Sequence, residues 1–138
     1  MAAEEASLPA MDFGLSADLF NYIDATGTLR VTVRQPEQAV FVIEVAGELD
    51  MLTQPPLEAR LATVLNSRPE RLIIDLSQIT FLGSTGLTAL LDAREAAARQ
   101  GTVLQLSGAD HRAVARPLRI TGLAELFETA PPAGGPDS

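Results

Sequence analysis

The sequence contains no cysteine and a single histidine, His111. The absence of cysteine excludes disulfides, thiolate metal sites and cysteine nucleophiles, and it is typical of an intracellular protein. One imidazole leaves little from which a metal cluster or a serine–histidine pair could be built. We therefore expect a protein without a metal and without a cofactor.

Basic charge and long apolar runs are also scarce. The chain has 18 acidic and 10 basic side chains, which give a formal net charge of −8. This charge repels a phosphate backbone, and no basic cluster with interleaved aromatic residues offsets it. The N-terminal MAAEEASLPAMDF is acidic where a secretory signal is basic, and no apolar run approaches the roughly 18 residues of a membrane span. We expect a cytoplasmic protein with no direct nucleic-acid contact and no membrane span.

The length and the apolar content suit a single domain. The chain has 138 residues, of which 46% are hydrophobic, enough for one core. We expect residues 1–27 to form a partly mobile N-terminal extension, residues 28–129 to form the folded domain, and residues 130–138 to form a disordered tail rich in proline and glycine. Within the extension, residues 12–23 hold enough large apolar side chains for a short helical turn or two.

Strand and helix signals follow one another in the first half of the domain. Residues 28–34 alternate apolar and polar side chains, and residues 39–47 follow after the turn-like QPEQ, so the pair predicts a hairpin. Pro55 and Pro56 suit the first turn of a helix. The apolar face of this helix is predicted to consist of Leu57, Leu61, Val64 and Leu65.

The alternation continues in the second half. Residues 71–77 form a short aliphatic run, which predicts a central strand covered on both faces. Residues 86–101 predict a helix that Gly101 ends in the C-terminal cap position. Residues 102–108 predict the next strand.

The C-terminal part predicts a third helix and an edge segment. Asp110 is expected to cap a helix that runs to about Ile120, with Gly122 after it, although Pro117 opposes a helix there. Residues 125–129 are expected to add a short edge segment. All the elements together predict an α/β fold, in which a mixed sheet of four to five strands packs against three or more helices.

The segment FLGSTGL, residues 81–87, joins a strand signal to a helix signal. Ser84 occupies the natural N-cap position, where its oxygen would stabilise the helix by about 1 kcal/mol relative to alanine. This cap leaves Thr85, Gly83 and Gly86 unexplained. A site that enters a partner's active centre requires a small accessible hydroxyl, and flanking glycines keep the approach open. Gly86 has a second interpretation, in which it allows the helix to pack closely on the sheet.

A hydrolase would also place a serine at a strand-to-helix turn. The nucleophile-elbow pattern G-x-S-x-G is not met, because Leu82 stands two residues before Ser84. His111 is the only imidazole available as a base, and a lone histidine on a predicted helix is more often a surface or packing residue. We therefore expect a protein that is not an enzyme.

Three segments together resemble a known family: GELD at residues 47–50, LIIDLSQITFLGSTGLTALL at residues 72–91 and RQGTVLQLSG at residues 99–108. The family is the STAS domain family, specifically the bacterial anti-sigma factor antagonists. The segment TGLAELFE, at residues 121–128, resembles the closing segment of the family. The resemblance covers the chain from about residue 28 to residue 128, and the order of its elements agrees with the order predicted above.

The resemblance implies a protein that binds an anti-sigma factor and thereby frees a sigma factor for transcription. In this family the anti-sigma factor is usually a serine kinase with a histidine-kinase-like ATPase fold, which reverses the binding by phosphorylating a serine. That serine falls on Ser84, with Thr85 as the second choice. Gly83 replaces the aspartate of the family pattern D-S-[ST]-G. Either the kinase recognises the site differently, or the domain binds its partner without being phosphorylated.

The resemblance also implies a partner-binding surface, made of Glu48, Asp50, Gly83, Ser84, Thr85, Gly86 and Leu87. Glu48 and Asp50 have a simpler interpretation as solvated loop residues, with Asp50 or Thr53 capping the first helix. Phe81 and Leu82 are expected to pack inward, as large apolar residues at the end of a buried strand usually do. An alternative function is a STAS scaffold or accessory subunit of a signalling or lipid-transport assembly, without a phosphorylation switch.

Overall fold

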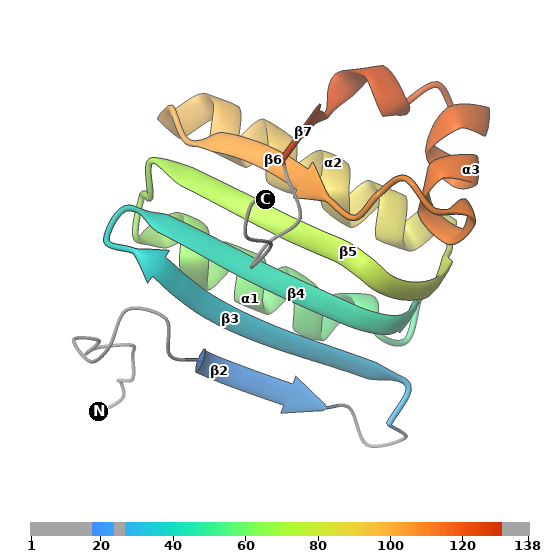
Figure 1. The fold of residues 1–138 in the computed structure, drawn as a ribbon, viewed down its shortest axis with the longest axis horizontal. Coiled ribbons are helices and arrows are strands. Elements are labelled where there is room, and N and C mark those ends of the chain that lie inside the picture. Colours follow the sequence, from blue (N-terminus) through green and yellow to red (C-terminus); the bar gives the residue numbers. More distant parts are fainter. Residues whose placement is uncertain (1–17, 24–26, 131–138) are drawn as a thin grey trace.

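The computed structural model describes residues 18–23 and 27–130 of the chain. Within them, six strands form one sheet in the order β2-β3-β4-β5-β6-β7 (Figure 1). The strands are β2 (Asp18–Ile23), β3 (Leu29–Glu37), β4 (Val40–Leu49), β5 (Arg71–Leu82), β6 (Val103–Ser107) and β7 (Glu128–Thr129). The helices are α1 (Gln54–Asn66), α2 (Ser84–Gln100), α3 (Arg112–Ile120) and the short 3₁₀ helix η1 (Ala124–Leu126).

The sheet is mixed, because its two halves differ in strand direction. β3 pairs antiparallel with both β2 and β4, whereas β4, β5, β6 and β7 run parallel. The predicted hairpin and the predicted α/β class are confirmed, although the sheet has six strands rather than four to five. The edge segment predicted at residues 125–129 contains β7. Because β4, β5 and β6 are parallel, the loops that follow them all leave from the carboxyl-terminal end of these strands.

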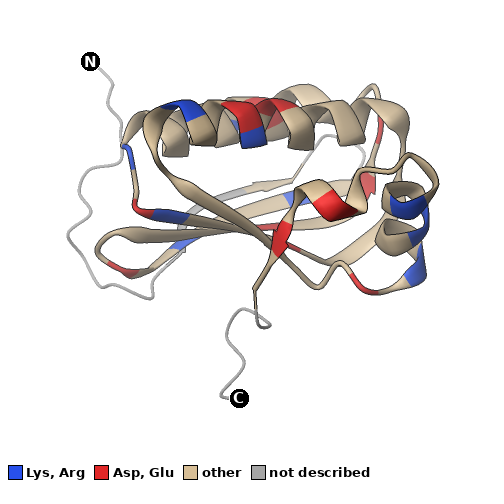
Figure 2. Cartoon of the chain, turned by 90° about the horizontal axis from the view of Figure 1, so that it is seen from above, with Lys and Arg blue, Asp and Glu red and all other residues tan. Residues whose placement is uncertain are grey.

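The two long helices form a layer over one face of the sheet. α1 and α2 lie side by side on this face, and α3 lies at one end of the sheet (Figures 1 and 2). α1 buries the four residues that the helical spacing predicted. Leu87 and Leu90 of α2 belong to the same buried cluster as Ile43 and Ile74 of the sheet. The removal of these apolar side chains from water is the main force that holds the two layers together.

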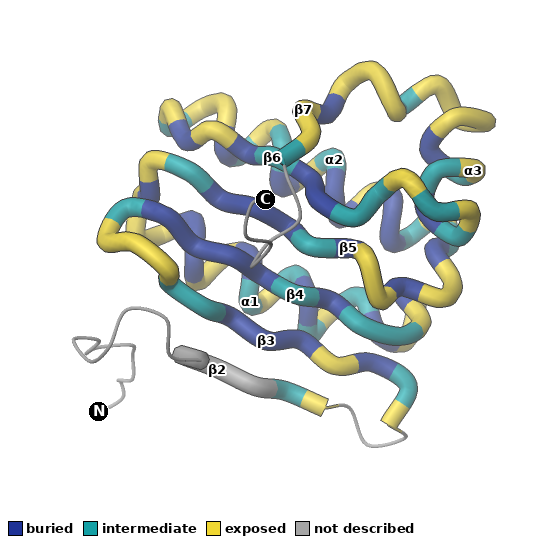
Figure 3. Tube along the Cα trace, viewed as in Figure 1, coloured by how far each residue is buried: buried dark blue, intermediate teal, exposed yellow. Residues whose placement is uncertain are grey.

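β5 is the central strand that the sequence predicted. Residues 72–74 are buried one after another, so both faces of this part are covered. The helices cover one face, and on the other Ile73 packs with Val40 and Val42 in a small second cluster. Beyond Leu76 most side chains of β5 are exposed, because the strand runs past the end of β6 toward the start of α2 (Figure 3).

The ends of α1 and α2 follow the turn chemistry that the sequence predicted. Pro55 and Pro56 lie in the first turn of α1, where a missing N–H costs no helical hydrogen bond. Gly101 ends α2 with a left-handed φ of 81°, and its N–H donates to the carbonyl oxygens of the last turn. These features depend on neighbours along the chain, which is why local sequence signals find them.

The start of α3 differs from the prediction. The N-cap position belongs to His111 and not to Asp110, and the helix continues through Pro117 to Ile120. The Nε2 atom of His111 lies 2.9 Å from the carbonyl oxygen of Leu76. This contact fixes the beginning of α3 on β5, so a tertiary interaction decides where the helix begins.

The strand β2 corrects the prediction for the segment before residue 28. A helical turn in residues 12–23 is wrong for Asp18–Ile23, which pairs antiparallel with β3; residues 12–17 lie outside the described residues. A short apolar segment is ambiguous between helix and strand. Here the edge of β3 offers backbone partners, and pairing satisfies them. The expected mobile extension (residues 1–27) and disordered tail (residues 130–138) consist mainly of residues that the structure does not describe.

Gly47 pairs with Leu29 at the open end of the β3–β4 hairpin, and the backbone there leaves no room for a side chain. Its φ is 106°, and a Cβ atom built there would lie 2.0 Å from the carbonyl oxygen of Thr28. We expect Gly47→Ala to lower the free energy of unfolding, measured by urea denaturation, far more than Gly122→Ala does. Gly122 has a φ of 77° and no neighbouring atom within 4 Å, so alanine there costs only the left-handed strain of about 1–2 kcal/mol. Equal losses in the two variants would contradict the clash.

Candidate functional site

The ends of β4 and β5 bring the GELD and GSTG segments together. Glu48 lies opposite Phe81, and Leu49 lies opposite Leu82 in the parallel register. The N–H of Gly83 then donates a 2.9 Å hydrogen bond to the carbonyl oxygen of Leu49. The two segments, more than thirty residues apart in the sequence, therefore form one continuous edge of the molecule.

The start of α2 corrects the role predicted for Ser84. Gly83 is the N-cap, with an extended backbone (φ −89°, ψ 179°), and no side chain caps the helix. The first helical hydrogen bond runs from the N–H of Leu87 to the carbonyl oxygen of Gly83, at 3.1 Å. Because the bond of Gly83 to Leu49 fixes the backbone, the N-cap lies one residue earlier than predicted. Ser84 becomes the first helical residue, and its side chain is exposed.

The first turn of α2 is suited to an anion. The first N–H groups of a helix, here those of Ser84, Thr85 and Gly86, have no acceptor within the helix. The helix dipole adds a positive potential at the same end, and this turn contains no acidic residue. The hydroxyl of Ser84 is thus a small, exposed group next to backbone donors, and Thr85 beside it is half-buried.

The two glycines of the turn allow close packing of α2 on the strand ends. Gly86 is buried, and a Cβ atom there would lie 2.7 Å from Cδ1 of Leu82 and 2.9 Å from Cγ of Leu49. This geometry supports the packing interpretation of Gly86. Gly83 is half-buried, and a Cβ atom there would lie 3.2 Å from the ring of Phe81. Both glycines therefore contribute to the packing beneath the turn, as does the buried Leu87.

Asp50 and Thr53 close the turn between β4 and α1. One carboxylate oxygen of Asp50 accepts hydrogen bonds from the N–H groups of Leu52 (2.9 Å) and Thr53 (3.1 Å). The hydroxyl of Thr53 donates to the carbonyl oxygen of Glu48 (2.8 Å) and accepts from the N–H of Asp50 (2.9 Å). Thr53 holds the N-cap position, one of the two predicted, but its side chain makes no cap bond to the helix. Asp50 therefore shapes the turn, and Glu48 stays exposed.

Three large apolar side chains around this edge were not predicted as surface residues. Met51 is 71% exposed, Leu52 84% and Phe81 53%; we call these three residues the apolar turn patch. The expectation that Phe81 packs inward is wrong, whereas Leu82 is buried as expected, since consecutive strand residues point to opposite faces. Met51 and Leu52 precede the periodic apolar face of α1. This position is the sequence signal that could have indicated their exposure. Large exposed apolar residues on two adjoining turns are candidates for an interaction surface.

His111 takes the packing role that the sequence favoured. Its ring contacts the carbonyl oxygen of Leu76 at the start of α3. Among residues 18–23 and 27–130, no group of three or more histidine, cysteine, aspartate and glutamate residues could hold a metal ion. In the same part of the chain, no helix is long and apolar enough to cross a membrane.

The chain is similar to known proteins in its sequence. A family model described as "Mlab, STAS domain" matches residues 31–128. The chain is 32% identical over 106 residues to the anti-sigma-F factor antagonist RsfB of Mycobacterium tuberculosis, which covers 76% of this chain and 84% of that protein.

Solved structures share the fold. The crystal structure of an anti-sigma factor antagonist from Mycobacterium paratuberculosis matches with a TM-score of 0.65 and 35% identity, over 72% of this chain and 82% of that chain. The unphosphorylated form of the anti-sigma factor antagonist SpoIIAA matches with a TM-score of 0.63 and 18% identity, over 72% and 87% of the two chains. The second match supports the fold alone.

The hydroxyl groups of Thr53 and Ser84 differ in their hydrogen bonds, so we expect their removal to have different effects on the free energy of unfolding. Thr53→Val leaves the N–H of Asp50 without its partner, so we expect the free energy of unfolding to fall by about 1–3 kcal/mol. Ser84→Ala removes an exposed hydroxyl that caps no helix, so we expect a change within about 0.5 kcal/mol. Chemical denaturation of both variants measures these values. A loss of about 1 kcal/mol in Ser84→Ala would indicate a capping serine after all.

Proposed function

The chain belongs to the STAS domain family, in which the anti-sigma factor antagonists are regulators rather than enzymes, and we propose that it is an anti-sigma factor antagonist working in the cytoplasm by partner switching. It binds an anti-sigma factor, which is a serine kinase with a histidine-kinase-like ATPase fold, and so releases a sigma factor for transcription. The named roles of its relatives support this assignment. The observation that carries it is an exposed Ser84 hydroxyl, free of any capping role, beside the apolar turn patch.

The proposed docking surface combines an apolar centre with a small polar one. Met51, Leu52 and Phe81 supply exposed apolar area of the kind that becomes the desolvated core of an interface. Ser84 is exposed and Thr85 is half-buried at the helix start, and Gly83 and Gly86 beside them add no side chain that would obstruct an approaching kinase. The other members of the surface act around this centre: Glu48 at the rim, Asp50 and Gly83 through the shape of the turns, and Gly86 and Leu87 by holding α2 in place.

Phosphorylation of Ser84 fits this fold without damaging it. A phosphoserine adds about −1.5 to −2 charges. At the start of α2 the free N–H groups and the helix dipole favour that charge, by about 0.3–1 kcal/mol for an exposed group. The modified protein therefore stays folded, and the switch acts on binding.

The same charge opposes the complex. Inside an interface a phosphate must lose water or face a partner's acidic groups, at a penalty of several kcal/mol when no cation pairs with it. Each 1.4 kcal/mol changes the affinity about tenfold. Glu48 is exposed near the end of β4, opposite Phe81, and adds negative charge near the site. The effect on binding thus exceeds the effect on stability.

Gly83 favours the transfer of a phosphate in one respect. The family pattern places an aspartate at this position, and its absence lowers the repulsion of an incoming phosphate. Gly83 also serves as the N-cap with an extended backbone, a position that glycine tolerates well. The exchange of aspartate for glycine is therefore compatible with both the fold and the proposed modification.

The binding of the cognate kinase tests the charge of the turn. We expect Ser84→Asp to weaken the complex at least tenfold in a calorimetric titration, whereas Ser84→Ala and the neutral, similarly sized Ser84→Asn keep most of the affinity. Phe81→Ala is expected to weaken the complex without a change in charge, because it removes an apolar anchor. Equal affinity of the aspartate and asparagine variants would reject the switch and favour a scaffold subunit.

The site of phosphate transfer is a separate prediction. Incubation with the kinase and ATP, followed by peptide mass spectrometry, is expected to place the phosphate on Ser84 of the wild-type chain. Ser84→Ala is expected to lose nearly all of the signal, while Thr85→Val keeps it, because Thr85 is less exposed. A phosphate found only outside these two residues would overturn the assignment.

A further inference from the structure

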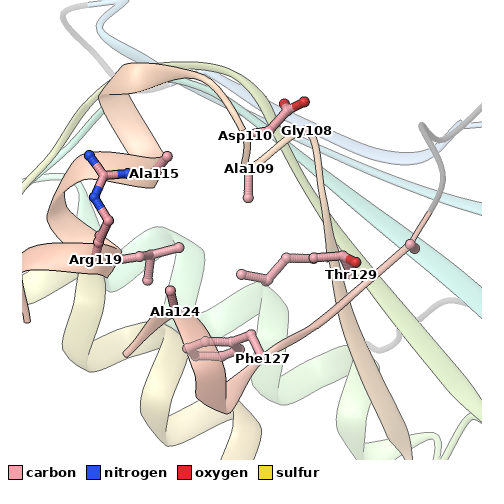
Figure 4. A pocket seen from close by; sticks show the side chains of 11 residues that line it. Gly108, Ala109, Asp110, Ala115, Arg119, Ala124, Phe127 and Thr129 are labelled. Carbon is pink, nitrogen blue, oxygen red and sulfur yellow. The ribbon is translucent and has the colours of Figure 1, made fainter. Parts of the chain in front are cut away.

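A cavity of about 450 Å³ lies among the C-terminal elements, apart from the Ser84 turn. It is bounded by the end of β6, by α3 and by the chain from η1 to β7 (Figure 4). Its size falls in the range of small-molecule sites. The lining is mainly apolar and includes Leu106, Ala109, Ala115, Leu118, Ala124 and Phe127.

The walls of this cavity are held in place without a ligand. β7 pairs with β6, and the N–H of Ala130 donates a 2.8 Å hydrogen bond to the carbonyl oxygen of Leu106. On the other side, Nε of Arg94 in α2 donates to the carbonyl oxygen of Leu126, also at 2.8 Å. Leu118 and Phe127 anchor the walls in the main core. Three alanines, Ala109 after β6, Ala115 in α3 and Ala124 in η1, also line the hollow, and their small side chains leave it open.

Positive charge gathers on the α3 side of the cavity. Arg119 lines it, and together with Arg112 and Arg116 it also lines an adjoining hollow. The spacing of the three residues places them along one side of α3, and basic residues colour this helix in Figure 2. None of the three forms an ion pair in the described part of the chain. Asp110 is the one acidic residue of both linings, and in Figure 4 its carboxylate points away from the centre of the larger, apolar cavity.

We propose that this cavity binds a small amphipathic anion, namely an aliphatic carboxylate. The hydrocarbon chain fills the apolar hollow, and the carboxylate pairs with Arg119 and its neighbours on α3. Arginine suits this role because its planar guanidinium binds a carboxylate through two parallel hydrogen bonds. In a chain with a net charge of −8, three arginines that form no ion pair with residues 18–23 or 27–130 lie beside an apolar cavity and select for negative charge at this place.

Titration of the isotope-labelled full chain with sodium decanoate, below the concentration at which it forms micelles, tests the site. We expect saturable shifts of the amide resonances of Ala109, Ala115 and Ala124. In the series hexanoate, octanoate and decanoate, the dissociation constant is expected to fall about fourfold for each buried methylene. Decyltrimethylammonium, with the same chain and a positive head group, is expected to bind at least tenfold more weakly. The absence of saturable shifts, or equal binding of the cation, would overturn the proposal.

Matched variants separate the head-group contact from the cavity itself. Arg119→Glu is expected to weaken decanoate binding at least tenfold, whereas Arg99→Glu, an equal charge change in the last turn of α2, leaves it within twofold. Ala124→Leu places a large side chain at an exposed position that lines the cavity. This variant is expected to keep its melting temperature and lose the titration. Equal weakening by the two glutamate variants, or unchanged binding by Ala124→Leu, would contradict the site.

Discussion

The parallel pairing of β4 with β5, closed by the hydrogen bond from Gly83 to the carbonyl oxygen of Leu49, is the constraint on which the rest of the functional edge depends. It brings together two turns that are far apart in the sequence. It also fixes the backbone at Gly83, which makes this residue the N-cap and pushes Ser84 into the first helical turn. The absence of a side chain at Gly86 then allows α2 to pack on the ends of both strands.

This arrangement separates stability from function at the level of single groups. Buried or half-buried groups, among them Thr53, Asp50 and Gly86, hold the turns through hydrogen bonds and close packing. The exposed groups, Ser84 and the apolar turn patch, contribute little to these contacts. A charge on Ser84 therefore changes what the edge can bind, while the helix start tolerates it because its N–H groups and dipole favour an anion.

The C-terminal elements add a second kind of surface to the same small sheet. The apolar turn patch has acidic neighbours, namely Glu48 and Asp50, whereas α3 carries arginines beside an apolar cavity. Both surfaces follow from the parallel half of the sheet, since the loops after β4, β5 and β6 leave on the same side. Parallel strands require long connections, and those connections carry the exposed chemistry.

The sequence by itself determined the features that depend on neighbours along the chain. The spacing of apolar residues defined the buried face of α1, prolines and Gly101 marked helix ends, and the GELD and GSTG segments indicated the family. Only the tertiary structure decided that Asp18–Ile23 is a strand, that Gly83 rather than Ser84 caps α2, and that Phe81 is exposed. Each of these outcomes depends on a backbone partner or a packing surface from a distant segment, namely the edge of β3, the carbonyl of Leu49 and the extension of β5 beyond β6. Local periodicity carries no information about such partners, because they exist only once the sheet has formed.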